Sequence, residues 1–424
     1  MKPTVLALIA AAAVIAFAAD EPDGLTLPPG FHATVVADSL GPVRHLAVRP
    51  NGDIYLSTPK DPQGKGSGII AVRLDPNHRA SDVQHFGTVD GGTGIRFYKG
   101  ALYASSPSGV YRFAMNGNEL VPKAEPVAIV QGTPENHPGF NRTNRPIAFD
   151  GKGNLFIALD AAANICTDPP IPLGGNVKAP PVGLKPCPDL QTRAGIWRFS
   201  ADKTGQKFPS DGEQWATGIR DMTALDWSSA DGHLYGIMHG RDSSNRFWPD
   251  QITAEAEDQI ADEMHRVDKG TDFGWPYTYY DGVRKLRLIA PEYGGDAKTS
   301  PKDHTYSTPV LTFQSRRPAP VDLTFYTGDR FPASYRNGAF IVLHGTANRT
   351  GYDVLFVPFN NGKPGTPIVF ADGFAAFDKS PAGAPRARYR PMGIAQAPDG
   401  SLYVVDSQQG RLWRISYDSP STHN

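Results

Sequence analysis

The stretch DGSLYVVD at residues 399–406 begins with a tight turn built on glycine and continues as a short apolar strand. Five other stretches have the same form: NGDIYLST (51–58), KGALYASS (99–106), KGNLFIAL (152–159), DGHLYGIM (231–238) and NGAFIVLH (337–344). Such recurrence indicates repeated supersecondary units that bury their faces against one another. Because the unit is a β-meander, the sequence predicts an all-β fold, a six-bladed β-propeller with four-stranded blades.

The spacing of the turn glycines favours one closed domain. Gly52, Gly100 and Gly153 follow one another at close to the roughly 40–50 residues that a four-stranded blade needs. The next two intervals, on either side of Gly232, are longer and predict insertions. In the longest, the Ala- and Glu-rich segment 250–267 predicts a short helical insertion at the surface.

The ends of the chain predict its domain boundaries. Residues 1–18 read as a secretory signal peptide, with a lysine, an apolar run and an Ala-x-Ala cleavage site. A retained membrane anchor is the alternative, although the run is short for a bilayer. We expect a linker at 19–29, the propeller at 30–418 and a tail at 419–424, and hence a periplasmic or secreted protein without a membrane span.

Both chain ends are expected to contribute to one blade. The alternating segment FHATVVA (31–37) and the last strand, GRLWRISY (410–417), are predicted to pair. Pairing would remove a sheet edge that otherwise invites aggregation.

The charge balance argues against some partners. The chain has 42 Lys and Arg residues against 43 Asp and Glu residues, a formal net charge of −1. Near neutrality gives no electrostatic reason to expect a nucleic-acid or anionic-membrane partner.

Two cysteines, Cys166 and Cys187, flank a loop rich in proline and glycine. An even count in an exported chain predicts a disulfide between them. Two free buried thiols are the alternative. A structural zinc site would need four ligands, so two cysteines alone do not indicate one.

Arginines near the ends of predicted strands are the candidate ligand-binding residues. If the segment RARYRPMG is extended, Arg388 and Arg390 point to the same side, and such a pair is suited to a polycarboxylate. A plain basic surface patch is the alternative. Arg220 and Arg349 belong to other repeats, and a propeller would bring all four to one axis, where an anionic small ligand fits.

From residue 28 to 417 the chain resembles the soluble sugar dehydrogenases that depend on pyrroloquinoline quinone (PQQ), especially their sorbosone or pyranose dehydrogenase branch. The motifs that carry the resemblance are, in order, NICTDPP, LQTRAGIWRFSA, TGIRDMTALDW, HGRD, FGWPYTYYDG, LHGTANRTG and RYRPMGIAQAPDGSLYVVD. The family implies a six-bladed propeller. Trp275 and Tyr277 in this set are expected to pack between blades rather than to do chemistry.

The resemblance also implies two cofactors, PQQ and calcium. By the family pattern, Arg220, Arg388 and Arg390 match cofactor-binding arginines, and Asn348 or Arg349 falls near a cofactor-binding lysine of some members. The loop at Gly240 and Arg241 resembles one whose main-chain carbonyls help to hold calcium, an ion that prefers oxygen ligands. The quinone would supply the redox chemistry.

The family's mechanism requires a histidine base oriented by an aspartate. Asp160 falls on the aspartate, and Arg145 falls on an arginine found in relatives, but the histidine position carries Asn141, or Arg142 by another count. His137, four residues before Asn141, is the candidate base if its loop bulges toward the site. A solvated loop histidine is the alternative.

The predicted function is therefore oxidation of a sugar or sugar aldehyde by hydride transfer to PQQ, with electrons passing to a separate acceptor. No CxxCH haem motif occurs in the chain. The main alternative is a non-catalytic propeller that binds a PQQ-like ligand or a partner. A calcium-dependent hydrolase propeller is a weaker option, since the predicted loops offer arginine and histidine rather than clustered carboxylates.

Overall fold

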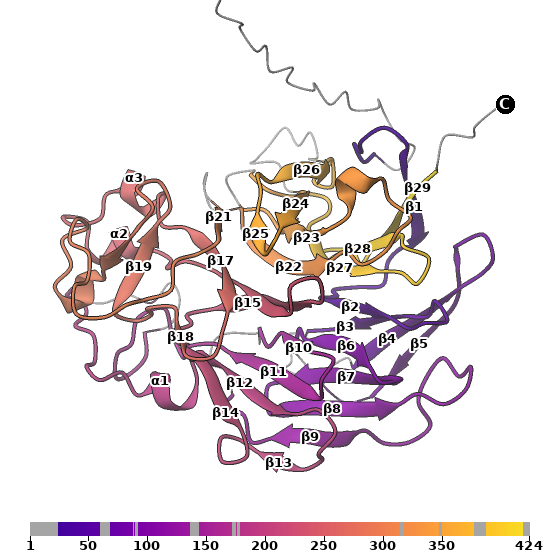
Figure 1. Ribbon diagram of the computed structural model, residues 1–424, viewed down its shortest axis with the longest axis horizontal. Coiled ribbons are helices and arrows are strands. Elements are labelled where there is room, and N and C mark those ends of the chain that lie inside the picture. The colour runs from indigo at the N-terminus through magenta and orange to yellow at the C-terminus, as the bar shows by residue number, and fades with distance from the viewer. Residues whose placement is uncertain are drawn as a thin grey trace, which may run out of the picture.

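Six sheets of four or five strands stand around a central axis in the part of the chain that the computed structural model describes (Figure 1). The described residues are 24–59, 68–87, 89, 92–135, 144–171, 175, 179–313, 318–346, 350–376 and 387–418. Each sheet is one blade, which confirms the predicted six-bladed propeller. No helix among these residues is long and apolar enough to cross a membrane.

The first three blades follow the chain in order. Blade 1 contains β2 (Leu46–Val48), β3 (Ile54–Ser57), β4 (Ile69–Leu74) and β5 (Ala80–Phe86). Blade 2 contains β6 (Ile95–Tyr98), β7 (Ala101–Ser106), β8 (Gly109–Ala114) and β9 (Val127–Gln131), with β13 (Gln206–Lys207) added at its edge. Blade 3 contains β10 (Ile147–Phe149), β11 (Asn154–Leu159), β12 (Gly195–Ser200) and β14 (Glu213–Thr217), with β18 (Thr271–Asp272) at its edge.

The second half of the chain forms the other three blades. Blade 4 contains β15 (Met222–Ser228), β16 (His233–Met238), β17 (Asp262–Val267) and β21 (Leu311–Phe313). Blade 5 contains β22 (Pro320–Phe325), β23 (Gly338–Leu343), β24 (Val354–Asn360), β25 (Lys363–Pro364) and β26 (Ile368–Ala371). Blade 6 contains β27 (Pro391–Gln396), β28 (Leu402–Asp406), β29 (Leu412–Tyr417) and β1 (Phe31–Ala37).

Blade 6 is closed by both ends of the chain, as predicted. Strand β1 pairs antiparallel with β29, from Phe31 opposite Tyr417 to Ala37 opposite Leu412. The first strands of the blades also contact one another in a closed ring, in the order β2, β6, β10, β15, β22, β27 and back to β2. The structure therefore has no open side between its first and last blades.

Each of the six glycine turns opens the second strand of one blade, namely β3, β7, β11, β16, β23 and β28. Gly100 and Gly400 have φ values of +77° and +81°, a region that favours glycine. Each turn lies at the end of its blade where the first strand stops and the second begins. The opposite face therefore collects the loops that precede the first strands and follow the second strands.

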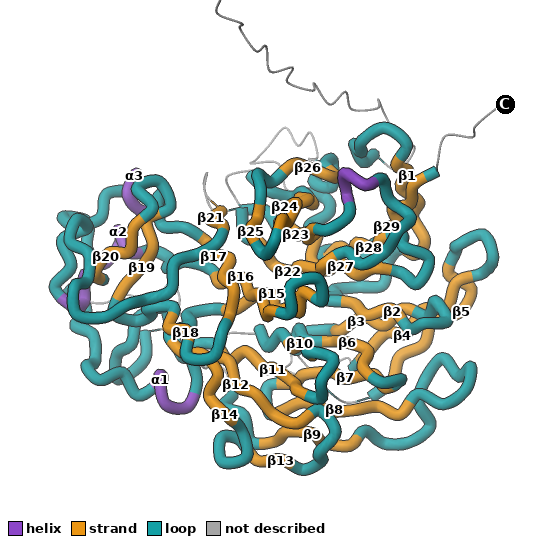
Figure 2. Tube along the Cα trace, in the orientation of Figure 1, coloured by secondary structure: helices purple, strands orange, loops and turns teal. Residues whose placement is uncertain are grey.

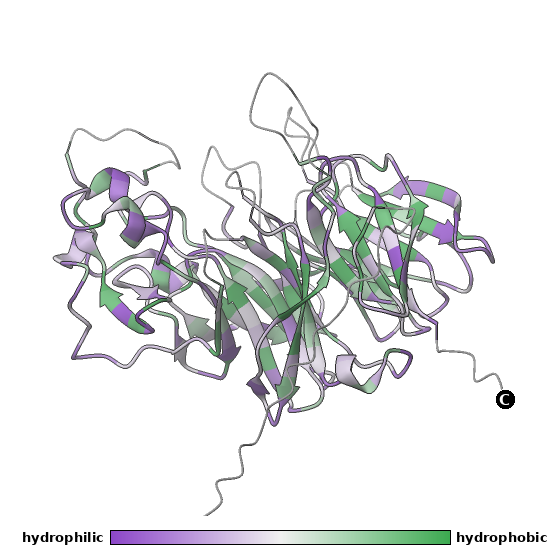
Figure 3. Ribbon diagram, turned by 90° about the horizontal axis from the view of Figure 1, so that it is seen from above, coloured by the Kyte–Doolittle hydropathy of each residue, from purple (hydrophilic) through white to green (hydrophobic). Residues whose placement is uncertain are grey.

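The core consists of apolar layers between neighbouring blades. One layer joins Tyr55 and Ala71 of blade 1 to Ile95 and Leu102 of blade 2, and other pairs of blades share similar clusters. Figure 3 shows the hydrophobic residues concentrated in the strands of the blades, with the hydrophilic ones toward the loops.

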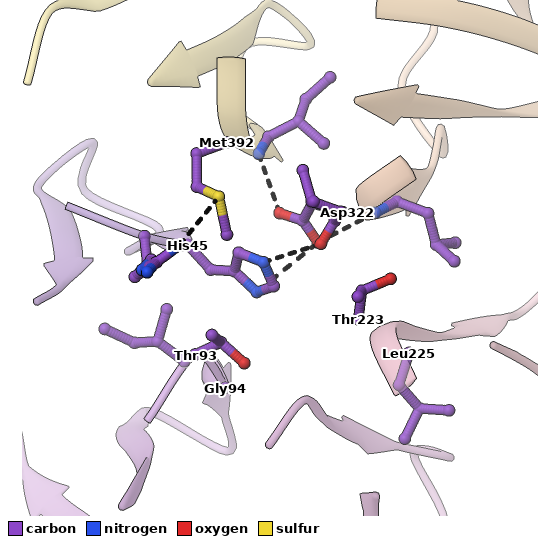
Figure 4. Close-up of polar contacts among 12 residues, drawn as sticks. His45, Thr93, Gly94, Thr223, Leu225, Asp322 and Met392 are labelled. Carbon is purple, nitrogen blue, oxygen red and sulfur yellow. Dashed lines mark hydrogen bonds and ion pairs between the residues drawn. The ribbon is translucent and has the colours of Figure 1, made fainter. Parts of the chain in front are cut away.

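Polar side chains from the first strands meet near the axis. His45, which is 1% exposed, places Nε2 3.0 Å from the Val321 carbonyl oxygen and Nδ1 3.9 Å from Asp322 Oδ1 (Figure 4). Asp322 Oδ2 accepts a hydrogen bond from the main-chain N–H of Ile394 at 2.9 Å. Arg96 adds an ion pair to Asp322 at 3.8 Å. Burial lowers the pKa of His45, so its imidazole is neutral. The charges of Asp322 and Arg96 beside it neutralise each other.

The predicted helix at 250–267 was mostly wrong. Only α3 (Ala254–Glu257) is helical, capped by the Thr253 hydroxyl, and Asp262–Val267 forms β17 (Figure 2). Met264 pairs with Ile237 and is buried in blade 4, so the blade's need for a third strand outweighs a local helix preference.

A smaller unit lies beside the propeller, at the left of Figure 1. It contains α3, α2 (Ser244–Phe247) and a hairpin of β19 (Thr278–Asp281) and β20 (Leu286–Ile289). The sequence from 281 to 310 is rich in charged residues and glycine and predicts loops, so β20 was not expected. The remaining short helices are α1 (Asp189–Thr192), η1 (Pro291–Tyr293) and η2 (Ala333–Tyr335).

The disulfide between Cys166 and Cys187 is present, with Cα atoms 6.1 Å apart. Trp275 lies in one buried cluster with both cysteines, and Tyr277 packs against that cluster. These aromatics therefore line the disulfide loop, and the prediction that they pack between blades was wrong.

Candidate functional site

The face opposite the glycine turns carries the candidate residues. Asp160 follows β11, Arg220 precedes β15, Gly240 follows β16, and Arg390 precedes β27. They come from three blades that the sequence separates widely. The ring of first strands brings their loops to one end of the axis.

Arg220 is held by three hydrogen bonds to the protein. Its Nε donates to Asn164 Oδ1 at 2.9 Å, its Nη1 to the Gly240 carbonyl at 2.6 Å, and its Nη2 to Asp242 Oδ2 at 2.5 Å. The side chain is 9% exposed. Such a fixed guanidinium is pre-organised to bind an anion at its remaining N–H groups.

Asp221, the next residue, contacts the neighbouring loops. Asn144 Nδ2 donates to its Oδ1 at 2.5 Å, and His239 Nδ1 lies 3.6 Å from its Oδ2. Burial alone would raise the pKa of Asp221, but the contact with His239 and the charges of His239 and Arg220 outweigh it and lower the pKa. Asp221 is therefore an ionised carboxylate at neutral pH.

Asp160 has the opposite electrostatic character. Its Oδ1 accepts a hydrogen bond from the Met222 main-chain N–H at 2.9 Å. Desolvation and the nearby Asp221 carboxylate raise the pKa of Asp160 well above its ordinary value, against the smaller opposing effect of Arg145. Asp160 can therefore hold a proton under conditions in which Asp221 cannot.

Arg145 is a buried cation with unused donors. It is 1% exposed, and its Nη2 donates to the Pro134 carbonyl at 2.9 Å. Its Nε and Nη1 have no hydrogen-bond partner among the described residues. Burial lowers the pKa of Arg145 to about 10. Unsatisfied buried donors are costly, so this position favours an added acceptor.

Arg388 and Arg390 have different surroundings. Arg390 donates through Nη2 to the Gly345 carbonyl at 2.5 Å, and its guanidinium lies 5.9 Å from the centre of the Tyr352 ring. Arg388 is exposed, and its guanidinium lies 5.3 Å from the centre of the Tyr389 ring. Each thus packs on its own aromatic residue.

The groups of the loop predicted to hold calcium already bind other residues of the protein. The Gly240 carbonyl accepts from Arg220, and the Gly240 N–H donates to Asp262 Oδ1 at 2.9 Å. Arg241 is buried and pairs with Glu292 at 2.8 Å. Among the described residues, no group of three or more His, Cys, Asp or Glu side chains could hold a metal ion.

Three of the predicted site residues, His137, Asn348 and Arg349, lie outside the described residues. The structure also adds residues that sequence reasoning did not select, namely Asn144, Asn164, Asp221 and His239. Two signals could have found some of them. Asp221 adjoins Arg220 in the GIRD motif, and Asn164 stands two residues before a disulfide cysteine.

Comparison with known proteins places the chain in a family. The TrAA12-like family matches residues 187–418, more than half of the 424-residue sequence. The chain belongs to this family. The matched region contains Arg220, Gly240, Arg388 and Arg390, whereas Asp160 lies before it.

Solved structures share the propeller of this TrAA12-like protein. The holo PQQ domain of pyranose dehydrogenase from Coprinopsis cinerea superposes with a TM-score of 0.69 at 16% identity, over 92% of this chain and 97% of that one. A calcium structure of the family AA12 enzyme of Trichoderma reesei gives 0.67 at 15% identity, over 93% and 97%. PQQ-bound aldose sugar dehydrogenase from Streptomyces coelicolor gives 0.57 at 16% identity, over 92% and 100%. At these identities the likeness establishes the fold.

Two curated proteins are related in sequence. Aldose sugar dehydrogenase YliI of Escherichia coli (strain K12) is 25% identical over 284 residues, which are 64% of this chain and 58% of that protein. An uncharacterized protein of Borreliella burgdorferi is 26% identical over 210 residues, 48% of each chain. The chain thus aligns with about half the length of these relatives.

Proposed function

We propose that this protein is an exported oxidoreductase that uses PQQ to oxidise a sugar or sugar aldehyde. The observation that carries the proposal is a set of arginines, Arg145, Arg220 and Arg390, from three blades at one end of the axis. Two buried nitrogens of Arg145, Nε and Nη1, have no acceptor among the described residues. A ligand with several carboxylates would satisfy such donors.

The residues present fit an anionic cofactor of this kind. Arg220 and Arg390 are the described residues proposed to hold PQQ, with the exposed Arg388 as a third candidate. Asn348 or Arg349, which lie outside the described residues, are proposed from the sequence alone. When bound, PQQ would supply the two-electron acceptor for a hydride from the sugar. A separate acceptor, either a cytochrome or a quinone, would then reoxidise it.

Proton handling would fall to His137 and Asp160. The imidazole of His137 would accept the proton of the substrate hydroxyl, a task suited to a group that titrates near neutral pH. Asp160 would orient it through Oδ2, which has no hydrogen bond among the described residues, while Oδ1 stays on Met222.

Calcium remains a prediction that the described geometry does not favour. The Gly240 carbonyl that would bind the ion accepts a hydrogen bond from the Arg220 cation at 2.6 Å. A calcium ion there would have to displace Arg220 or share the oxygen with it. We therefore assign calcium no part in the reaction.

Reconstitution tests the proposal. The purified protein is titrated with PQQ in the presence of calcium or of a chelator, binding is followed by absorbance, and dye reduction is assayed with aldoses and sorbosone. We expect saturable binding and sugar-dependent dye reduction. Binding without turnover would favour the non-catalytic alternative, and absence of binding under both conditions would overturn the proposal. Binding that survives chelation would exclude a required calcium ion.

A further inference from the structure

Asn164 is a buried side chain that connects two loops of the site. It is 8% exposed, and its Oδ1 accepts hydrogen bonds from Arg220 Nε at 2.9 Å and from the Asp242 main-chain N–H at 3.0 Å. Its Nδ2 donates to the Asp242 carbonyl at 2.5 Å. The carboxamide therefore fixes the loop of Asp242 and the guanidinium of Arg220 together.

Asp242 is in turn one of the three groups that hold Arg220. Its Oδ2 accepts from Arg220 Nη2, and the Gly240 carbonyl accepts from Nη1. A guanidinium has five N–H groups. Nε and one hydrogen of each terminal nitrogen are engaged by the protein, and Nη1 also lies 3.9 Å from Asp221 Oδ2. The second N–H of Nη2 is the donor that these contacts leave for a ligand.

The main chain of Asn164 is anchored by the disulfide unit. Its carbonyl accepts a hydrogen bond from Trp275 Nε1 at 3.1 Å. Trp275 belongs to the same buried cluster as Cys166 and Cys187, and Cys166 is only two residues from Asn164. The disulfide, which lies outside the blades, is therefore connected to Arg220 by two steps: Trp275 hydrogen-bonds the main chain of Asn164, and the Asn164 side chain hydrogen-bonds Arg220.

We propose that Asn164 is a positioning residue that aims Arg220 at a carboxylate-bearing ligand, and that the disulfide loop holds Asn164 in place. The ligand part of this inference rests on the proposed function. Removing the carboxamide leaves a buried Nε–H without an acceptor and frees the Asp242 loop. The Arg220 side chain then samples several rotamers in the free protein. Each binding event must order it again, and this entropy cost weakens binding.

The first measurement is made without any ligand. In the wild-type protein the Nε–H of Arg220, assigned by its loss in Arg220→Lys, should give a protected ¹⁵N resonance that exchanges slowly with solvent. Asn164→Ala should abolish this protection, and Asn164→Asp, which keeps the oxygen acceptor, should retain it. Unchanged protection in Asn164→Ala would overturn the positioning role. Asn164→Leu, close in volume but without an acceptor, is the substitute if the alanine variant does not fold.

The second measurement is the affinity for PQQ. Asn164→Ala should raise the dissociation constant about tenfold or more, because hydrogen bonds to charged groups contribute about 1.5 kcal/mol or more. In an Arg220→Lys background the same change should cost less than about twofold, because its effect passes through Arg220. Equal losses in both backgrounds would contradict the proposal. The matched control is Thr167→Val, since the Thr167 hydroxyl donates to the Pro169 carbonyl in the same loop.

The two measurements separate the two proposals. If wild-type protein binds no PQQ, the proposed function fails, and the protection of the Arg220 Nε–H alone decides the positioning role. If wild-type protein binds PQQ and Asn164→Ala binds it equally well, the proposed function stands and the role of Asn164 in binding is overturned.

Discussion

Asp160 and Asp221 are two carboxyl groups on neighbouring loops whose pKa values are displaced in opposite directions. Asp160 is raised by desolvation and by Asp221, whereas Asp221 is lowered by His239 and Arg220 against its own burial. Pairs whose surroundings separate their pKa values in this way are common where protons are transferred. At the residue scale, this pair and Arg145, whose Nε and Nη1 have no partner among the described residues, are the features that favour an anion-binding, proton-transferring site on this face.

A second carboxyl pair, Asp353 and Asp372, lies in blade 5 and makes stability depend on pH. Burial, followed by the charge of Asp372 and a hydrogen bond with it, raises the pKa of Asp353 to about 8. An unfolded aspartate has a pKa of about 3.9. The folded state therefore holds this proton more tightly, and the pair's stabilising contribution is complete below about pH 4 and lost as the pH rises to about 8.

Asp353→Asn should remove this dependence, because an asparagine amide donates to Asp372 at every pH. Thermal unfolding at pH 5, 7 and 9 should show the variant gaining on the wild type as the pH rises, with the largest gain at pH 9. Asp303→Asn, at an exposed position, is the control. A constant difference between variant and wild type across these pH values would contradict the assigned pair.

At the scale of elements, the disulfide loop couples stability to the site. The bridge spans a sequence separation of 21 residues. Cys166→Ala with Cys187→Ala should cost roughly 3 kcal/mol of unfolding free energy by loop entropy. Denaturant unfolding measures this loss, and wild-type protein treated with reductant should match the double variant. Loss of less than about 1 kcal/mol would mean that Trp275 and its neighbours hold the loop without the bridge.

Segment 250–267 shows where element predictions fail. Its composition favours a helix, yet Asp262–Val267 serves as the third strand of blade 4. The strand is stabilised by pairing with β16 on one side and β21 on the other. Local propensity contains no information about these partners. The hairpin of β19 and β20 was missed for a related reason, since a short two-stranded unit depends on packing around Leu288 rather than on a strong pattern.

At the scale of the whole molecule, closure of blade 6 should determine whether the propeller folds as one unit. Strand β1 covers the edge of β29, and Phe31 packs edge-on against Phe331 and Phe370 of the blade 5 region. A chain that starts at residue 38 would expose that edge and this aromatic cluster. An exposed edge is a template for aggregation.

We expect the chain that starts at residue 38 to be largely insoluble or to unfold at a much lower temperature than a chain that starts at Gly24. Size-exclusion chromatography and thermal unfolding distinguish the two. A monomeric, cooperatively unfolding protein that lacks residues 1–37 would show that β1 is not needed for closure.

The repeated glycine turns and the pairing of the chain ends could be predicted from the sequence because each depends on local signals. A turn glycine with an apolar strand after it predicts each of the six blades, and alternation at both termini predicts their closure. Five of these glycines have positive φ, and in the blade 5 turn Asn337 takes that conformation instead. The even cysteine count similarly predicted the disulfide. The arginines were candidates because each stands beside a recognisable strand.

Only the tertiary structure decided what those arginines contact. Arg220 is engaged by Asn164 and Asp242, Arg390 lies against Tyr352, and the Gly240 carbonyl is occupied by a guanidinium rather than left open. These partners lie in loops of different blades and in the unit beside the propeller. Their proximity follows from closing the ring, which no local pattern encodes. The physical reason is that strand formation depends on neighbouring residues, whereas the site depends on contacts between segments far apart in the chain.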